Sequence, residues 1–445
     1  MNRYLAKSKL FFLLTILIVS IDIHPAYSAD LIEVYNLAER NDPQFRQVAA
    51  NKRAVLEQRP QAISQLLPQV GLSANTYRNS QDSTISSGFG AGGEFDYNSH
   101  GYNVNLTQPL FRWDRYLRLK QADNLIKQAD AELGLAQQEL IIRVAESYFE
   151  ILAAIDSLQF AQAEKRSLSR QLEQSKQRFE VGLTAITDVQ EAQAGYDQAV
   201  AQEIQAGNAV DNAREALREI TGSYFTELPE LTDSMPLLTP EPADIDEWTN
   251  TAVKESLSVL AALEAVDNAR EEIGIQRSGH LPTLDVVTQY GYSTTGGRFG
   301  DSSTRSTAIG LELNVPLFQG GFVSSKTREA QQRLQEQMER LEQARRKAHR
   351  DTREAYLGVI SGISQIKALN QAVISSETAL QATEAGYEVG TRTAVDVVTS
   401  ERTTYQAKRD YARARYNYIL DTLRLKLASG LLSTDDLIQV NQWLN

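Results

Sequence analysis

A phrase of eleven residues that occurs twice constrains this chain more than any other feature of its sequence. The first copy begins at Phe179 and reads FEVGLTAITDV, and the second begins at Tyr387 and reads YEVGTRTAVDV. Because Glu180 corresponds to Glu388, the copies are offset by 208 residues. A glycine interrupts a helical pattern in each copy, as in a turn between two helices. The repetition predicts a duplicated chain with two helical tips at equivalent positions.

Long alanine-rich helical patterns run into and out of both tips. In the first half, apolar residues step by four and three from Ala122 to Leu140, and two apolar seams coexist around Tyr148. One seam is typical of a two-stranded coiled coil, whereas two seams require neighbouring helices on both flanks. The pattern predicts one helix from Trp113 to Glu180, roughly 100 Å long at 1.5 Å per residue.

The return helix after the first tip, over 188–221, is only about half as long as the outgoing helix. A helix predicted over 43–65 begins at Asn41-Asp42-Pro43, where proline occupies the first turn. Stacked end to end, the two shorter helices match the long one in length. Each half is therefore expected to contain one continuous helix and one composite helix.

Four other segments alternate apolar and polar residues with a period of two, which predicts β-strands. Glycine-rich sequence separates the strands of each pair, at 88–93 and at 296–298. A glycine run holds phosphate where it leads from a strand into a helix. The run at 88–93 leads into another strand, so a loop is predicted there. The alternating residues lie between Val70 and Thr76, Tyr102 and Leu106, Leu284 and Tyr292, and Ile309 and Val315.

The first 28 residues have the pattern of a secretory signal peptide. Basic residues precede an apolar run from Leu10 to Ile21, and Ala26-Tyr27-Ser28 provides a small-residue cleavage site. An uncleaved anchor is the alternative, but the run is shorter than the ~20 residues needed to span a bilayer. Cleavage removes three basic residues and one acidic residue, so the net charge changes from −12 to −14. Such an acidic chain is not expected to bind nucleic acid.

The composition gives little support to an enzyme. Cysteine is absent, which excludes thiolate nucleophiles, thiolate metal sites and disulfides. The four histidines, at 24, 100, 280 and 349, include no pair spaced to hold a metal. Carboxylates are expected only on solvated helix faces. The sequence therefore predicts no catalytic residues, no cofactor and no metal.

Four alternating strands in an exported chain cannot close a barrel by themselves. Open sheet edges are not tolerated in lipid, and the smallest bacterial transmembrane barrels have about eight strands. If these strands span a membrane, the chain must self-associate, with two copies giving 8 strands and three giving 12. The alternative is a small four-stranded sheet that packs on a helix bundle in the periplasm.

Motifs throughout the chain resemble those of the TolC-type outer-membrane efflux channels. The resemblance implies a mixed, mostly α-helical fold: a homotrimer with a 12-stranded β-barrel in outer-membrane lipid, continuous with a 12-helix α-barrel across the periplasm. It also implies an exit duct for drugs and other small molecules, with type I protein secretion as a further use. The motifs are Asn41-Asp42-Pro43, Leu67-Pro68-Gln69, His280–Asp285, Arg178–Gln190 without Glu180 and Thr184, and Gly386–Thr393 without Glu388.

The resemblance also implies a division of the chain into nine segments, with two internal repeats. A proline-rich linker, with Pro229, Pro236, Pro240 and Pro242, separates the two halves. The expected segments are a signal peptide (1–28), periplasmic helices (29–66), a β-hairpin (67–111), a helical hairpin (112–222, tip near 182–188), the equatorial linker (223–250), a helix (251–279), a second β-hairpin (280–318), a second helical hairpin (319–429, tip near 390–396) and a C-terminal equatorial segment (430–445).

Carried over residue by residue, the resemblance places a network that closes the duct at the tips, on Thr187, Asp188, Tyr387 and Arg392. Tyr387 can donate to Asp188, and Arg392 can bond to Thr187 and to the Asp188 carboxylate. Ordinary salt bridges at the tips are the alternative.

Further positions follow from the same resemblance. Asp396 matches an acidic ring at the narrowest point of the pore, but Thr399 stands where the family pattern has a second aspartate. A two-tier acidic filter is therefore in doubt. Docking to a periplasmic adaptor and an inner-membrane pump, of the RND, ABC or a similar type, is expected to open the tip. The expected adaptor contacts are Gly182, Leu183, Gly390 and Thr391.

A second kind of function also fits long helices in an exported chain. A coiled-coil protein could bridge layers of the cell envelope without conducting anything. Conductance in planar bilayers separates the two hypotheses, because only a channel conducts. The sequence names neither the cargo nor the pump.

Overall fold

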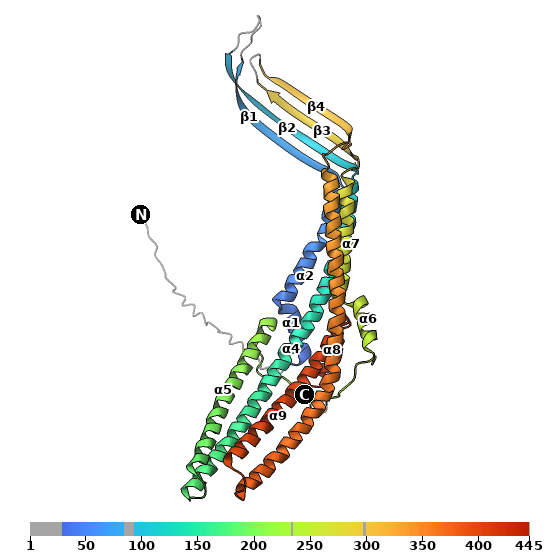
Figure 1. Ribbon diagram of the computed structural model, residues 1–445. Coiled ribbons are helices and arrows are strands. Elements are labelled where there is room, and N and C mark those ends of the chain that lie inside the picture. Colours follow the sequence, from blue (N-terminus) through green and yellow to red (C-terminus); the bar gives the residue numbers. More distant parts are fainter. Residues whose placement is uncertain (1–28, 84–92, 233–234, 297–299, 445) are drawn as a thin grey trace, which may run out of the picture.

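The computed structural model describes residues 29–83, 93–232, 235–296 and 300–444. A four-stranded sheet lies beyond one end of a long set of helices, and short helices surround that set near its middle (Figure 1). The sheet is not packed against the helices, which argues against the small periplasmic sheet considered above. The predicted signal peptide over 1–28 and most of the glycine run at 88–93 lie outside the described residues.

All four predicted strands are present, and they form one antiparallel sheet in the order β1-β2-β3-β4. The central pair, β2 and β3, joins the two halves of the chain. Among the described residues, β1 and β4 each pair on one side only, so both edges of the sheet remain open. The strands are β1 (Gln69–Ser83), β2 (Gly93–Phe111), β3 (Thr283–Thr295) and β4 (Ser302–Asn314).

The strand register separates an apolar face of the sheet from a polar one. Paired residues in antiparallel strands face the same side, and successive residues alternate between sides. Val70 pairs with Leu106, whose row continues to Ile309 on β4. One residue along, Asn105 pairs with Gln289 on the opposite face. Ile309 is 75% exposed, so this apolar face is not covered by any of the described residues of the chain.

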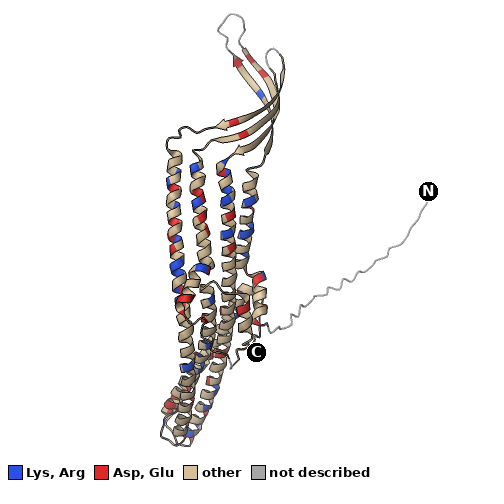
Figure 2. Ribbon diagram, turned by 90° about the vertical axis from the view of Figure 1, so that its right-hand side faces the viewer, with Lys and Arg blue, Asp and Glu red and all other residues tan. Residues whose placement is uncertain are grey.

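Two continuous helices run along the whole molecule below the sheet. They are α4 (Trp113–Glu180) and α8 (Phe322–Glu388), with 68 and 67 residues. The return helices α5 (Ile186–Thr221) and α9 (Ala394–Ala428) are about half as long. Within the described part of the chain, no helix is long and apolar enough to cross a membrane. Charged residues are frequent along the helices and sparse on the strands (Figure 2).

The helix predicted over 43–65 is divided in two, which corrects that expectation. Helix α2 (Pro43–Leu56) ends before Glu57, and α3 (Gln58–Ser64) continues toward the sheet. Pro60 explains the break, because proline lacks an N–H donor and its ring clashes with the carbonyl four residues earlier, here that of Leu56. In the second half, one helix, α7 (Leu257–Ser278), occupies the corresponding level.

The shorter helices meet end to end at two equivalent junctions. In the first, the side-chain nitrogen of Asn41 donates to the carbonyl of Thr221 at 2.9 Å, and Gly222 ends α5 with a φ of 72°. In the second, Gly430 has a φ of 78°, and a Cβ atom there would lie 2.4 Å from the carbonyl oxygen of Glu255. Both junctions therefore need glycine, and the second also needs it for space.

A belt of short helices and extended chain covers these junctions and contains the largest apolar core cluster. The Tyr148 hydroxyl donates to Pro229 of the proline-rich segment, and the Asn441 side chain accepts from the Leu31 amide at 3.0 Å. The predicted linker over 223–250 ends inside one of these helices. They are α1 (Leu31–Asn41), α6 (Ile245–Glu255) and α10 (Thr434–Asn441).

One buried ion pair fixes the first junction to α4. Two guanidinium nitrogens of Arg143 donate to Asp42 at 2.7 and 3.1 Å, and Asp42 also caps α2 through the Phe45 amide. Burial alone would raise the pKa of Asp42. The hydrogen bonds from Arg143 and Phe45 outweigh that effect and hold the pKa below its ordinary value.

Candidate functional site

The two helical tips, at the end of the molecule opposite the sheet, have the same local construction. Gly182 has a φ of 77° and Gly390 a φ of 83°, a left-handed conformation that glycine adopts without a Cβ penalty. Each turn is closed by an amide that bonds back across five residues at 2.8 Å, from Leu183 and from Thr391. The expected adaptor contacts are exposed, and Leu183 is 72% exposed.

Among the four residues predicted to close the duct (the gate residues), Tyr387 is the most buried, with 6% exposure. Its hydroxyl lies 3.4 Å from the Ser175 hydroxyl of α4. The Arg178 guanidinium, also on α4, lies 4.7 Å from the centre of the Tyr387 ring. Arg178 donates as well to the carbonyls of Tyr387 and Glu388, at 3.4 and 3.5 Å. The first hairpin thus holds the C-terminal end of α8, where helix carbonyls lack intrahelical partners.

Sequence reasoning did not assign Arg178 this role. The residue was noted only as part of a motif. Its partner lies 209 residues away on another helix, and periodicity does not identify such a contact.

The other gate residues are placed as follows. Asp188 lies in the first turn of α5 and accepts a hydrogen bond from the Thr184 hydroxyl. Thr187 beside it is exposed. Arg392 lies in the second tip, with its amide bonded to Gly386 at 3.2 Å. In the described part of one chain, Tyr387 and Arg392 do not bond to Thr187 or Asp188, so bonds between copies of the chain stay a prediction.

Asp396 caps a helix in addition to its expected place at the pore. Its carboxylate accepts from the amide and the hydroxyl of Thr393, at 2.9 and 3.0 Å, and the Thr393 hydroxyl accepts from the Asp396 amide. Bonds from the Thr393 amide and hydroxyl lower the pKa of Asp396, which keeps its carboxylate charged within one chain. Threonine three residues before an acidic residue is the sequence signal for this capping box. Thr399, one turn later, is exposed.

Small apolar clusters, rather than one large core, hold the two hairpins together near the tips. Val398 of α9 packs with Leu168 of α4 and Ala199 of α5. A Cβ atom on Gly195 would lie 3.1 Å from Val398, so glycine allows this close approach. Segments with few buried contacts open at low free-energy cost. The tips are therefore the part of the helical set best suited to move.

The sheet and the tips together indicate a class of protein. An amphipathic sheet with two open edges continues into long helices that end in movable tips. Among the described residues, no group of three or more histidine or acidic side chains is placed to hold a metal. The open-edged amphipathic sheet and the long helices are the features expected of a channel protein that spans an outer membrane.

Comparison with known proteins identifies the family. The outer membrane efflux protein family matches residues 34–223 and 248–431, and the chain belongs to it. The chain is 40% identical over 427 residues to the outer membrane protein TolC of Vibrio cholerae, which covers 94% of each. It is 30% identical over 419 residues to the alkaline protease secretion protein AprF of Pseudomonas aeruginosa, over 93% of this chain and 86% of that protein.

Solved structures support the fold. The CmeC outer membrane channel of Campylobacter jejuni matches with a TM-score of 0.76 at 16% identity, over 93% of this chain and 90% of that one. The chain is thus a TolC-type efflux protein located in the outer membrane, and the predicted resemblance is confirmed.

Proposed function

We propose that three copies of this chain form one continuous efflux duct through the outer membrane and the periplasm. The observation that carries the proposal is the four-stranded sheet with one apolar face and two open edges. Pairing β4 of one copy with β1 of the next removes every edge, as lipid requires. Two copies would give an eight-stranded barrel, and side chains nearly fill the interior of a barrel of that size. Three copies give twelve and leave room for a lumen.

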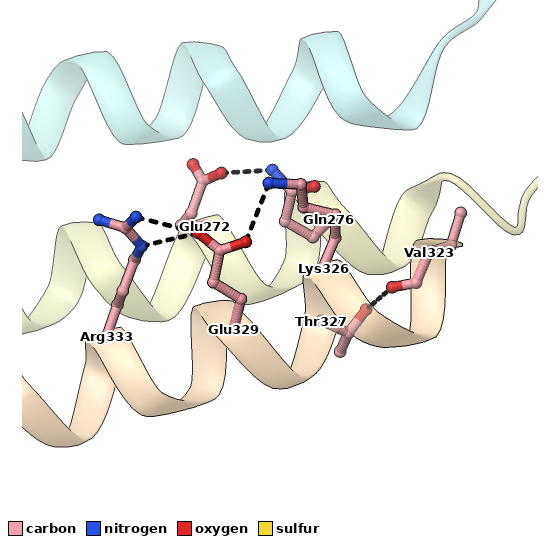
Figure 3. Close-up of polar contacts among 7 residues, drawn as sticks. All are labelled: Glu272, Gln276, Val323, Lys326, Thr327, Glu329 and Arg333. Carbon is pink, nitrogen blue, oxygen red and sulfur yellow. Dashed lines mark hydrogen bonds and ion pairs between the residues drawn. The ribbon is translucent and has the colours of Figure 1, made fainter. Parts of the chain in front are cut away.

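The helices support the same arrangement. Within one chain, α4 lies between α5 and α9, and α9 lies between α4 and α8, so one free flank of the wall belongs to α8. That helix carries a series of ion pairs four residues apart on its exposed surface, such as Glu329 with Arg333 at 2.9 Å. Figure 3 shows Glu329 between Lys326 and Arg333. In the trimer, this flank of α8 meets the α2 and α5 side of the next copy.

The tips close the duct at rest in this proposal. Arg392 and Tyr387 of the second hairpin bond to Thr187 and Asp188 across the assembled tips, and Asp396 forms the acidic ring. Charge-assisted hydrogen bonds contribute about 1.5–3 kcal/mol each, and a threefold assembly repeats them. A difference of about 5.5 kcal/mol moves a two-state population from 1:99 to 99:1. The network is therefore strong enough to keep the duct closed and weak enough for a partner to open.

A periplasmic adaptor, together with an inner-membrane pump, is the proposed partner that opens the tips. The turns at Gly182 and Gly390 present exposed apolar side chains, and Val181 and Val389 are 70% and 75% exposed. Apolar residues at such a surface favour docking of another protein. The name of the relative AprF, an alkaline protease secretion protein, supports polypeptide export as a second use of the same duct.

A double variant at the second tip tests the proposal. Tyr387→Phe with Arg392→Ser removes two donors and leaves the apolar seams intact, so the trimer is expected to form. Native mass spectrometry of the purified protein should give three times the protomer mass. Planar-bilayer recordings should show low conductance for the wild type and a large increase for the double variant.

The outcomes separate the possible failures. A monomer or dimer contradicts the trimer. A trimer that never conducts supports the alternative, a structural coiled-coil protein of the envelope. An unchanged conductance in a folded double variant excludes these residues as the closing network.

A further inference from the structure

A carboxyl group is buried between the two hairpins, about one and a half turns beyond the pore residue. Glu401 of α9 is 2% exposed. One of its carboxyl oxygens accepts a hydrogen bond from the Ser167 hydroxyl of α4. The other is buried and has no hydrogen-bond partner in the described residues. Buried polar atoms are almost always bonded, so this oxygen needs an explanation.

The charges around Glu401 do not compensate a carboxylate there. Glu164 of α4, which is 1% exposed, is the partner of Arg409 at 3.2 Å, so that guanidinium is already committed. Glu384 of α8 adds a second negative charge, and Arg170 of α4 is the cation that acts on Glu401. Charge is costly in such a place, whereas the neutral acid is tolerated.

On the fourth helix, α5, the side chain that bonds to α9 at this turn is the uncharged Gln198, which accepts from Arg402 at 2.9 Å. On α9 itself, Lys408 is paired with Glu377 of α8 at 2.7 Å. Arg402, Lys408 and Arg409 are therefore bonded to other groups, while Arg170 acts on Glu401 as a partly compensating charge.

We propose that Glu401 is a proton-binding site that holds the two hairpins together: it carries a proton while α9 packs on α4 and loses it when they separate. This proposal rests on the proposed function, because α9 and α4 separate only if the tips open. It differs from the closing network at the tips, which acts between copies, because Glu401 acts between the hairpins of one chain. Separation would bring water to Glu401 and stabilise its charged form.

The direction of the pH effect follows from the two states. Burial, with smaller contributions from Glu384 and Glu164, raises the pKa of Glu401 from 4.5 to about 7 while α9 packs on α4. Below pH 4.5 both states are protonated, and pH has no effect. Between pH 4.5 and 7 the packed state keeps a proton that the separated state has lost, so packing weakens up to tenfold per pH unit. Above pH 7 both states are ionised, and the effect reaches a limit of about 10²-fold.

Hydrogen exchange on the full-length trimer tests the proposal without depending on conduction. Peptides of α9 near Glu401 are followed from pH 4.5 to 8, with rates corrected for intrinsic exchange. In the wild type, corrected opening should increase by about 10²-fold over this range. Glu401→Gln, a neutral group of the same shape, should stay protected at every pH, and Glu401→Met gives a second neutral packing variant.

Two controls make the result specific. Glu191→Gln removes an exposed carboxylate on α5 and should leave the pH profile unchanged, while Asp396→Asn removes titration of the pore residue. The proposal is overturned if both folded Glu401 variants show the pH profile of the wild type. It is also overturned if hydrogen exchange of α9 near Glu401 does not depend on pH in the wild type. A wild type that never conducts contradicts the proposed channel and leaves the exchange test of Glu401 valid.

Discussion

Replacing Arg178 by methionine is expected to release the end of α8 from α4. Methionine is unbranched and a good helix former, so it keeps contact with the Tyr387 ring while it removes the charge and the donors. In the wild type, the guanidinium lies 4.7 Å from the ring centre, and its two bonds to carbonyls are 3.4 and 3.5 Å long. These three contacts set the size of the effect.

The cation–π contact of a partly exposed arginine contributes about 0.5–1 kcal/mol. The two hydrogen bonds are at the long limit of the acceptable range, so together they contribute about 1 kcal/mol rather than more. The loss is then about 1.5–2 kcal/mol per chain, or a 10- to 30-fold change in the opening equilibrium of one tip. If the tips of all three chains of a trimer open together, the loss approaches about 5 kcal/mol, enough to reverse the population.

Two measurements check this prediction. Single-channel recordings should show a higher open probability for Arg178→Met, and hydrogen exchange should increase in the last turn of α8. Arg178→Lys keeps a cation but loses the planar donors, and should give an intermediate result. Arg218→Met is the matched control, because Arg218 is an exposed arginine near the end of α5 that pairs with Glu215. If Arg178→Met behaves like this control in both assays, the clamp on Tyr387 does not hold the tip.

The remaining predictions concern the junctions and the pore. Gly222→Ala should cost about 1–2 kcal/mol of stability from left-handed backbone strain, and Gly430→Ala should cost more, because its Cβ would overlap a carbonyl at 2.4 Å; equal thermal shifts would contradict this difference. Asp396→Ala should reduce the preference of the channel for cations and should weaken its inhibition by trivalent cations added from the periplasmic side. Because Thr399 replaces a second aspartate, this inhibition should already be weaker in the wild type than in a relative with two acidic rings. Bilayer recordings that show no change would place the ring elsewhere. Asp42 contributes stability that is complete above its ordinary pKa of 3.8 and lost as the pH falls below it, so Asp42→Asn should flatten the acid limb of thermal unfolding.

Local periodicity accounts for the parts of the fold that sequence reasoning predicted well. The predicted helix from Trp113 to Glu180 coincides with α4, because heptad steps and two apolar seams continue without a breaker. The strands follow from alternation with a period of two. The division at Glu57 was predictable from Pro60, but the length match with the return helix favoured one continuous helix.

Contacts between distant helices were beyond the reach of the sequence. The capping of α9 by Thr393 and Asp396 lies within four residues and has a recognisable pattern. The contact of Arg178 with Tyr387 joins two helices through a geometry that no repeat offset encodes. Glu401 is similar, because a glutamate on a long helix is usually solvated. Only the packing of α9 on α4 shows that it is buried.

The bonds of Asn441 bring the two ends of the described chain together. Its side chain accepts from the Leu31 amide and donates to Asp30, both at 3.0 Å. A short peptide that joins these ends, with new ends cut at an exposed position of the linker such as Thr239, would give a circular permutant in which the halves exchange their order. Because each half supplies one hairpin of strands and one of helices, such a permutant should keep every neighbour it has now. A permutant that folds and assembles would show that the order of the two halves along the chain is not required for the fold.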